Sequence, residues 1–373
     1  MKKFIIYLII LLNSCSQKQR DLFESPEQLH DGIQTATLQD VGINESMIKS
    51  MHDSITAGVY PNIHSVLILR NNKLVYENYW PGHDENRATD FIGTVQQGRD
   101  SLHDIRSINK SIVSAAVMIA IDQGKLKDVK QRVFDFFPEY AKYDTGMKSK
   151  ITVEQLLTMS AGLYWSDDDQ IWYADSLKEK NIAHAINFIL RQPLVDTPGK
   201  TFKYSAGCTQ LLAQIVEKVT GLDIEKFTAT HLFKPMGITN YQWTKEKNGL
   251  ICAWGGLRMR SRDLLKFGML YHNKGNWNGK QIISENLVNE SLKKHIYTEE
   301  PYGYGYQFWT LVDTVENRII KTVEATGNGG QKIEINREED LILVITAGNY
   351  DKKNLKKTSY DVYLDFVHPA VIK

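Results

Sequence analysis

The sequence predicts an α+β fold, in which strands from both ends of the chain form one antiparallel sheet flanked by helices, with a mainly helical region inserted between them. Three observations support it: paired strand-like runs over residues 63–80, helical periodicity from 107 to about 237, and four strand-like runs over 304–347. The chain has 373 residues, 42% of them hydrophobic and 24% charged, which excludes disordered and fibrous proteins and allows a large core.

The first two strands are expected at residues 63–69 and 74–80, after a helix near 44–56. Arg70, Asn71, Asn72 and Lys73 lie between the two runs. These residues suit a tight hairpin turn, so the folded part of the chain should open with antiparallel pairing.

Helices are expected through the middle of the chain. The run after Ser107 is apolar on nearly every face up to Gly124, so this helix should lie at the centre of the protein. Thr152 and Gln155 form a capping-box pattern that marks another helix start. A later helix should end at Gly221, and its apolar positions are Leu211, Leu212, Ile215, Val216 and Val219.

Strands return near the C-terminus. They are expected at residues 304–311, 318–324, 331–335 and 341–347, with a turn at 336–340 before the last of them. A final helix is expected at about 359–367. We find no repeat, low-complexity tract or clean interdomain linker, so residues 40–373 are predicted to form one domain.

The N-terminus has the pattern of a secretion signal. Lys2 and Lys3 precede a nine-residue apolar run, which suits a signal-peptide core but is too short to span a membrane. Leu12, Asn13, Ser14 and Cys15 then resemble the lipobox of bacterial lipoproteins. We therefore expect a lipoprotein signal peptide at 1–14, lipidation of Cys15, and a polar tether at 15–39. The protein would then be lipid-anchored to a bacterial membrane, facing the periplasm or cell surface; the alternative is an uncleaved anchor with a chance cysteine.

The charge of the chain is close to neutral. Its formal net charge is +1, which gives no basic excess for binding nucleic acid. Residues 1–14 carry two lysines and no acid, so 43 basic and 44 acidic side chains remain without them. Cys208 and Cys252 would then be the remaining cysteines, either paired in an oxidising compartment or, as their small apolar neighbours favour, two buried thiols.

Ser107 and Lys110 are the first candidates for catalysis. They lie three residues apart at the start of the central helix, so both should project from the same face. The helix N-terminus favours alkoxide character on the serine, and a desolvated Lys110 would accept its proton. The plain alternative is an N-cap serine with a surface lysine, but a lysine in such an apolar helix needs a partner.

Two further segments carry candidate site residues. Tyr204 stands at the entrance of the helix that ends at Gly221, where it either packs or, beside a lysine, relays protons. Asn328, Gly329 and Gly330 precede a strand that begins at Gln331. This glycine segment is either a simple turn or a place where a ligand approaches the main chain closely. The N–H groups of Gln331 and Ser107 would then form an oxyanion hole.

These segments, in this order, resemble the serine β-lactamase and penicillin-binding-protein superfamily, specifically the class C β-lactamase-like serine hydrolases. The resemblance covers about residues 40–371, and its supporting segments are 63–80, 151–163, 198–221, 254–268 and 327–331. It implies a β-lactamase/transpeptidase-like fold and a cofactor-free hydrolase. It also implies that Ser107 is the acylated nucleophile, Lys110 its base or proton relay, and Tyr204 the tyrosine of the second motif.

Two departures from the family pattern bear on the substrate. The second motif often reads Tyr-x-Asn, whereas Ala206 stands third here and cannot hydrogen-bond a substrate amide. The third motif usually opens with lysine or histidine, whereas Asn328 brings no positive charge for a substrate carboxylate. Losing one such contact costs about 1.5 to 3 kcal/mol.

We therefore expect cleavage of a small ester or linear amide, as in the esterase and 6-aminohexanoate-dimer-hydrolase branch. The alternatives are a β-lactamase or DD-peptidase acting on peptide-like substrates, or a non-catalytic binding or sensing lipoprotein.

The remaining candidates are weaker. Trp165, Trp172 and Tyr173 line an acyl pocket in one interpretation and pack in the core or rim in the other. Asp167, Asp168 and Asp169 are expected to form a solvated loop. The ten histidines show no metal-ligand spacing, so we predict no metal, and His231 and Arg258 are expected to be structural.

Overall fold

The computed structural model describes residues 24–86, 90–166, 182–245, 249–315 and 318–372. The expected signal peptide and Cys15 lie outside these residues. Among the described residues, no helix combines the length and the apolar character needed to cross a bilayer.

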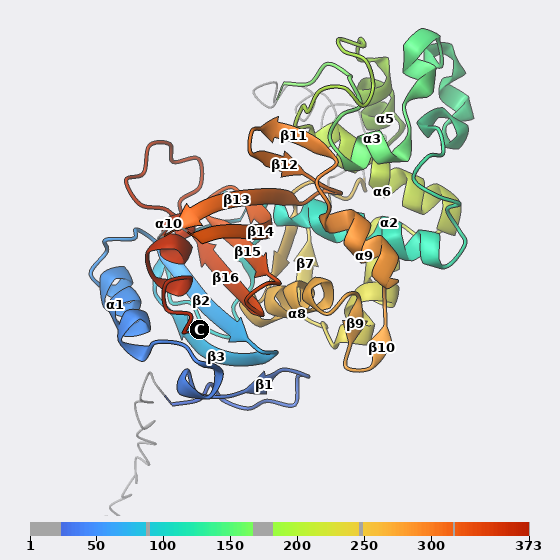
Figure 1. The fold of residues 1–373 in the computed structure, drawn as a ribbon. Helices are drawn as coiled ribbons and strands as arrows, with labels where there is room; N and C mark the ends of the chain where they lie inside the picture. The colour runs from blue at the N-terminus through green and yellow to red at the C-terminus, as the bar shows by residue number, and fades with distance from the viewer. Residues whose placement is uncertain (1–23, 87–89, 167–181, 246–248, 316–317, 373) are drawn as a thin grey trace, which may run out of the picture.

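A nine-stranded sheet forms the centre of the molecule and confirms the predicted union of the two ends of the chain (Figure 1). Its order is β1-β3-β2-β16-β15-β14-β13-β12-β11, and all neighbours pair antiparallel except β1 with β3. The strands are β1 (Gln34–Thr35), β2 (Ile63–Arg70), β3 (Lys73–Tyr79), β11 (Ile296–Glu299), β12 (Tyr302–Tyr304), β13 (Trp309–Val315), β14 (Arg318–Gly327), β15 (Gln331–Asn336) and β16 (Leu341–Ala347).

The predicted hairpin between β2 and β3 is confirmed. Asn71 and Asn72 form its two-residue loop, and both have positive φ, at 50° and 58°. Positive φ at both loop positions matches the right-handed twist of the flanking strands, which is why asparagine suits this turn.

Helices cover both faces of the sheet. On β16, Ile342 and Val344 belong to the main core, whereas Leu341, Leu343 and Ile345 belong to a second core. The second core is closed by α1 (Glu45–Thr56), α10 (Ser359–Val362) and the π-helical turn at Tyr363–Val367. The main core lies against α2 (Ile108–Asp122) and α8 (Ser261–His272). The sheet therefore holds α2, which begins beside Ser107, on its main-core face.

The helical region between the two parts of the sheet also matches the prediction. It contains α2, α3 (Val153–Leu157), α5 (Ile182–Arg191), α6 (Ala206–Thr220) and α7 (Ile224–Thr228), while α9 (Glu285–Leu292) follows α8. The capping box of Thr152 and Gln155 is present, and α6 ends at Gly221 with a left-handed backbone. All thirteen residues from Ile108 to Ala120 are buried, as expected for a central helix.

The predicted strand at 304–311 is wrong, because the chain leaves the strand between β12 and β13. Gln307 has a φ of 64° there and is buried, and its side chain accepts a hydrogen bond from Thr209 and donates to the carbonyls of Leu156 and Leu157. Its own carbonyl accepts from Ser111 Oγ at 2.6 Å. Gln307 thus joins α2, α3 and α6, a role that needs an irregular backbone.

Two other features differ from expectation. The segment expected to be a tether is folded from before residue 40: Ile33 and Leu38 are buried and β1 pairs with β3. The sequence also did not predict three small sheets. They are a hairpin of β4 (Gly82–Asn86) and β5 (Asp90–Val95), a hairpin of β9 (Asn276–Trp277) and β10 (Lys280–Gln281), and a three-stranded sheet of β6 (His103–Asp104), β8 (Leu257–Met259) and β7 (Tyr241–Trp243). These strands are short and polar or isolated, so alternation gives little signal for them.

Candidate active site

Ser107 lies at the N-terminal end of α2 and faces Lys110. Lys110 Nζ donates a hydrogen bond of 2.9 Å to Ser107 Oγ, as the three-residue spacing on a helix predicts. Ser107 is partly exposed, whereas Lys110 is 2% exposed. The residue before the serine, Arg106, has a φ of 49°, so the chain turns sharply into the helix. A reachable hydroxyl is thereby held against a buried amine.

The main chain of Trp254 provides the second contact of Lys110. Lys110 Nζ donates to the Trp254 carbonyl at 2.8 Å, and the neighbouring Asn109 side chain donates to the Cys252 carbonyl at 3.1 Å. The segment that follows β7 therefore holds the first turn of α2 from the side. Because Lys110 Nζ donates to both Ser107 Oγ and the Trp254 carbonyl, its position beside the serine is fixed.

Tyr204 comes to the same place from the start of α6. Lys110 Nζ lies 4.8 Å from the centroid of the Tyr204 ring, which brings the second predicted motif beside the first. The ring stacks on Trp309 of β13, with centroids 5.9 Å apart. Phe202 and Tyr304 pack against Trp309 as well, at 5.6 and 5.0 Å. Sequence reasoning missed this aromatic cluster because its members come from separate parts of the chain.

The glycine segment lies directly against the turn that leads into Ser107. A Cβ at Gly327 would lie 2.4 Å from the Ile105 carbonyl oxygen, so only glycine permits this approach. Gly329 and Gly330 have φ of 95° and 97°, which glycine adopts without strain. Gln331 is buried, and its side chain both donates to the Ala347 carbonyl and accepts from the Ala347 N–H. These contacts hold the start of β15 against the end of β16.

Asn328 is exposed and paired with a carboxylate. Its Nδ2 donates to Asp351 Oδ1 at 3.0 Å, and its Oδ1 accepts from the Asp351 N–H at 3.0 Å. The group beside this position is therefore negatively charged, where the family pattern would place a cation. A substrate carboxylate would meet repulsion here rather than attraction.

The predicted pocket aromatics are only partly described. Trp165 is 5% exposed and belongs to the main core, where a Cβ at Gly207 would lie 2.6 Å from its ring. This burial favours the packing interpretation of Trp165. Trp172 and Tyr173, together with the acidic run at 167–169, lie outside the described residues.

Both described cysteines, Cys208 and Cys252, are buried free thiols, the state that their neighbours favoured. Burial raises the pKa of the Cys208 thiol to about 12, against a small opposing effect of Ser205. His231 Nδ1 accepts a hydrogen bond of 3.0 Å from Gln123 Nε2, and the ring packs on Phe227, which is a structural role.

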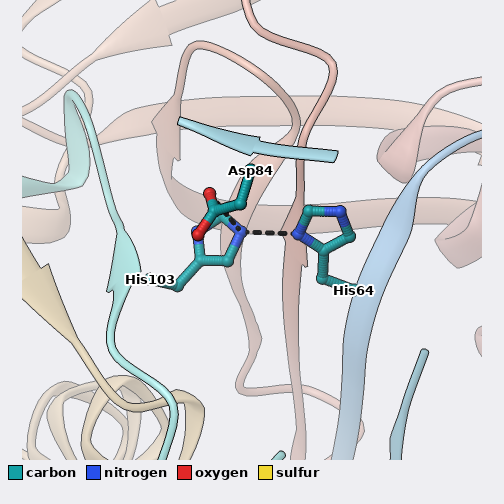
Figure 2. A group of neighbouring side chains, drawn as sticks. All are labelled: His64, Asp84 and His103. Carbon is teal, nitrogen blue, oxygen red and sulfur yellow. Dashed lines mark hydrogen bonds and ion pairs between the residues drawn. The ribbon is translucent and has the colours of Figure 1, made fainter. Parts of the chain in front are cut away.

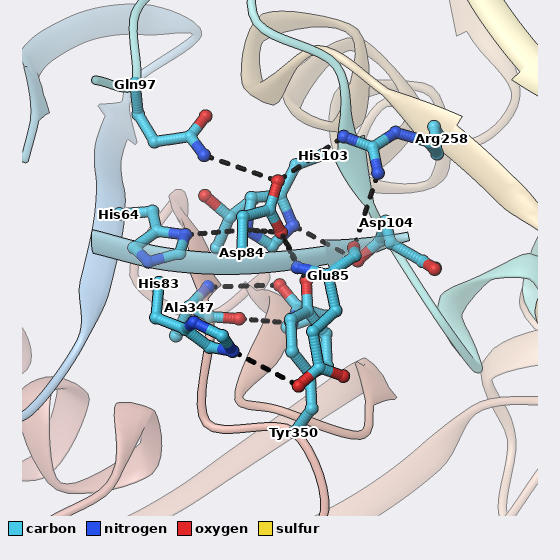
Figure 3. A network of polar contacts seen from close by, with 12 residues as sticks. His64, His83, Asp84, Glu85, Gln97, His103, Asp104, Arg258, Ala347 and Tyr350 are labelled. Atoms are coloured by element: carbon cyan, nitrogen blue, oxygen red, sulfur yellow. Dashed lines mark hydrogen bonds and ion pairs between the residues drawn. The ribbon is translucent and has the colours of Figure 1, made fainter. Parts of the chain in front are cut away.

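A polar network lies next to the turn that leads into Ser107, and Figure 3 shows residues that belong to it. Arg106 places its guanidinium 4.3 Å above the Tyr350 ring and reaches Asp104 and Glu85, each at 3.4 Å. The Tyr350 hydroxyl donates to Asp84 Oδ1 at 2.9 Å. Tyr350 also packs against Gly329, because a Cβ there would lie 2.6 Å from its ring. The network thus connects the turn before Ser107 with the glycine segment.

Three residues of this region that sequence reasoning missed are His64, Asp84 and His103 (Figure 2). They come from β2, β4 and β6, and each is at most 1% exposed. Burial, and then the neighbouring His103, lowers the pKa of His64 to about 3. Burial would raise the pKa of Asp84, but His103, Tyr350 and Arg258 hold it below its usual value. The long sequence separation hides the cluster from any spacing rule.

Comparison with known proteins places this geometry in a family. A putative D-alanyl-D-alanine carboxypeptidase of Escherichia coli K12 is 26% identical over 372 residues, covering 94% of this chain and 79% of that protein. The 6-aminohexanoate-dimer hydrolase of Paenarthrobacter ureafaciens is 24% identical over 306 residues, covering 74% and 70%. The structure of a putative beta-lactamase from Bacteroides dorei superimposes with a TM-score of 0.68 at 18% identity, covering 88% of this chain and 98% of that one.

The last of these similarities shows a shared β-lactamase/transpeptidase-like fold. The family model described as Beta-lactamase matches residues 56–361, a span that contains Ser107, Lys110, Tyr204 and the glycine segment. The chain therefore belongs to the Beta-lactamase family of serine hydrolases.

Proposed function

We propose that this protein hydrolyses a small ester or linear amide through an acyl-enzyme at Ser107. The observation that carries the proposal is the 2.9 Å hydrogen bond between Lys110 Nζ and Ser107 Oγ at the N-terminus of a buried helix. In the reactive form the amine of Lys110 is neutral and accepts the serine proton as Oγ attacks the substrate carbonyl carbon. A nucleophile without an adjacent base would be a weak one at neutral pH.

The remaining steps use groups that surround this pair. The N–H groups of Ser107 and Gln331 would stabilise the oxyanion, since Ser107 begins a helix and its N–H lies outside the helical hydrogen-bond ladder. Lys110, with Tyr204 beside it, returns the proton to the leaving alcohol or amine as the carbon–oxygen or carbon–nitrogen bond breaks. Water then attacks the acyl-enzyme with the same two residues as proton acceptors, which regenerates Ser107 and releases the acid.

The surroundings support an ester or linear amide over a β-lactam. Asn328 is neutral and is paired with Asp351, so the charge near the glycine segment disfavours the carboxylate that β-lactams carry. Ala206 supplies no amide-binding group. Phe202, Tyr204 and Trp309 are partly exposed and pack around the buried Tyr304, so these three rings supply apolar surface for an acyl or alkyl group next to the nucleophile.

The first test separates a serine enzyme from a non-catalytic relative. A fluorophosphonate should add one adduct to the wild type at Ser107, and none to Ser107→Ala, as measured by intact mass. Absence of the adduct from wild-type protein, or equal labelling of both proteins, would end the serine-hydrolase proposal.

The second test addresses the substrate. We expect a short-chain nitrophenyl ester to turn over with a higher kcat/KM than a chromogenic cephalosporin. Efficient turnover of the cephalosporin with no ester hydrolysis would instead favour a β-lactamase.

We also propose that the protein is anchored through a lipid on Cys15, on the strength of the signal-like N-terminal pattern. Full-length protein should partition into the detergent phase of a cloud-point separation, and Cys15→Ser should move to the aqueous phase. A detergent-phase preference that Cys15→Ser retains would contradict the anchor.

A further inference from the structure

The buried cluster of His64, Asp84 and His103 is not used by the reaction proposed above. The ligand-type atoms of the three side chains all lie within 4.8 Å of one another. His64 Nδ1 and His103 Nε2 face each other at 2.9 Å, and Asp84 Oδ1 lies 3.7 Å from His103 Nε2 (Figure 2). Three donors from three strands therefore converge on one point.

The outer nitrogen of His64 carries a proton. Asn62 is oriented by the main chain of His83, because its Nδ2 donates to the His83 carbonyl and its Oδ1 accepts from the His83 N–H. Its Oδ1 also lies 3.1 Å from His64 Nε2. Since this oxygen can only accept, His64 Nε2 must be the donor, and in a neutral ring Nδ1 is then a bare lone pair.

The outer nitrogen of His103 is fixed in the same way. His103 Nδ1 lies 3.1 Å from the main-chain carbonyl of Asp104, which can only accept. In a neutral ring, His103 Nε2 is therefore also a bare lone pair. Two lone pairs facing each other at 2.9 Å repel, so the space between the rings requires a cation.

The Asp84 carboxylate, the third donor, is also fixed by hydrogen bonds. Asp84 Oδ1 accepts from the Tyr350 hydroxyl and from the Glu85 N–H, both at 2.9 Å. Its Oδ2 lies 3.3 Å from the Arg258 guanidinium and 3.5 Å from Gln97 Nε2. Histidine ligands that donate their outer N–H to an oxygen, and carboxylate ligands that are themselves hydrogen-bonded, are typical of metal sites.

We propose that His64 Nδ1, His103 Nε2 and the Asp84 carboxylate bind one divalent transition metal ion of the zinc class. Two imidazoles and one carboxylate are a donor set that suits Zn²⁺, and a tetrahedral ion with bonds of about 2.0 to 2.1 Å needs ligand atoms about 3.3 Å apart. Two of the three distances, 2.9 and 3.7 Å, bracket that value. The remaining pair, His64 and Asp84, lies within 4.8 Å, so binding would draw the Asp84 carboxylate toward the His64 ring.

The surrounding charges are compatible with a cation. Asp84, Asp104 and Glu85 bring three negative charges, while Arg106 and Arg258 bring two positive ones. The ion would join β2, β4 and β6 a few residues before Ser107, and it would touch neither the substrate nor the serine. Its role would be structural, at the base of the turn that presents the nucleophile.

The test measures metal directly, and no activity assay enters it. Full-length protein without a polyhistidine tag is stripped with a chelator, dialysed against Zn²⁺ or Co²⁺, freed of excess ion, and measured by mass spectrometry of the elements. We expect about one ion per chain, a visible Co²⁺ absorption band of tetrahedral type, and a Tm that rises by about 5 °C at a hundredfold excess of ion over Kd.

Variants locate the ion. Asp84→Asn and His64→Gln should each lose it, whereas the control His83→Gln, which changes a half-buried histidine next to Asp84 but outside the cluster, should keep it. If a cluster variant fails to fold, the wild-type stoichiometry and Tm shift still decide. Wild type that holds no ion after loading, or cluster variants that hold as much as wild type, would overturn the proposal, and the cation between the rings would then be a proton.

Discussion

Lys110→Met isolates the role of the buried amine, because methionine keeps most of the side-chain volume and removes the amine. The variant loses the 2.9 Å contact with Ser107 Oγ and the 2.8 Å contact with the Trp254 carbonyl. A positioned general base contributes about 10² to 10⁴ in rate, so kcat/KM should fall by that factor, equivalent to about 3 to 5.5 kcal/mol.

The effect on stability should be much smaller. The Trp254 carbonyl loses a buried donor, which costs about 1 to 3 kcal/mol. Removal of the amine offsets part of this cost, because Lys110 is 2% exposed and a buried polar group is expensive to desolvate. We therefore expect a change in the free energy of unfolding of at most about 2 kcal/mol.

The assay is the initial rate of nitrophenyl ester hydrolysis, with urea unfolding followed in parallel. Lys148→Met is a matched control, since Lys148 Nζ also donates to a main-chain carbonyl, that of Gln192 at 2.7 Å, but away from the serine. Its kcat/KM should stay within about twofold of wild type. If Lys110→Met keeps more than about a tenth of wild-type kcat/KM while Ser107→Ala is inactive, another group is the base.

Three further predictions follow from individual contacts. Gly327→Ala should lower kcat by about 10- to 100-fold, because its Cβ would lie 2.4 Å from the Ile105 carbonyl and displace the turn before the serine; ester hydrolysis measures it. Cys208 should resist iodoacetamide at pH 8 in the folded protein and react after unfolding, because burial raises its pKa to about 12; peptide mass spectrometry measures the labelling. Burial lowers the pKa of His272 by more than the neighbouring Asp340 raises it. His272 therefore takes up its proton near pH 6.5 in the unfolded chain, but only at a lower pH in the folded chain. Stability should therefore fall from pH 7 to pH 5, and by less in His272→Gln, as urea midpoints at the two pH values would show.

Each of these has a contradicting outcome. Gly98→Ala is the control for the glycine variant, because the nearest atom to its Cβ would be 4.0 Å away; equal losses in both variants would refute the close-approach argument. Labelling of Cys208 in native protein at the rate of a free thiol would contradict its burial. An unchanged pH slope in His272→Gln would place the acid sensitivity elsewhere.

Much of the fold was predictable because its signals are local. The hairpin at Asn71 and Asn72, the capping box of Thr152 and Gln155, and the left-handed end of α6 at Gly221 each depend on a few neighbouring residues. The strand break at Gln307 was not predictable, since that residue leaves strand geometry to satisfy groups on three helices. Local propensity depends on neighbouring residues in the sequence, so it cannot indicate partners that are distant along the chain.

The candidate site divides in the same way. The pairing of Ser107 with Lys110 follows from helix geometry alone, and the resemblance to a family then indicated Tyr204 and the glycine segment. The aromatic partners of Tyr204, the carboxylate beside Asn328, and the carbonyl of Trp254 that orients Lys110 became visible only in three dimensions.

The sequence by itself determined the helix that pairs a serine with a lysine, the sheet drawn from both ends of the chain, and the near-neutral charge. Only the tertiary structure brought His64, Asp84 and His103 together and bound the turn before Ser107 to Tyr350. The physical reason is range: a helix relates residues three and four apart, whereas sheet pairing joins strands whose separation along the chain is arbitrary.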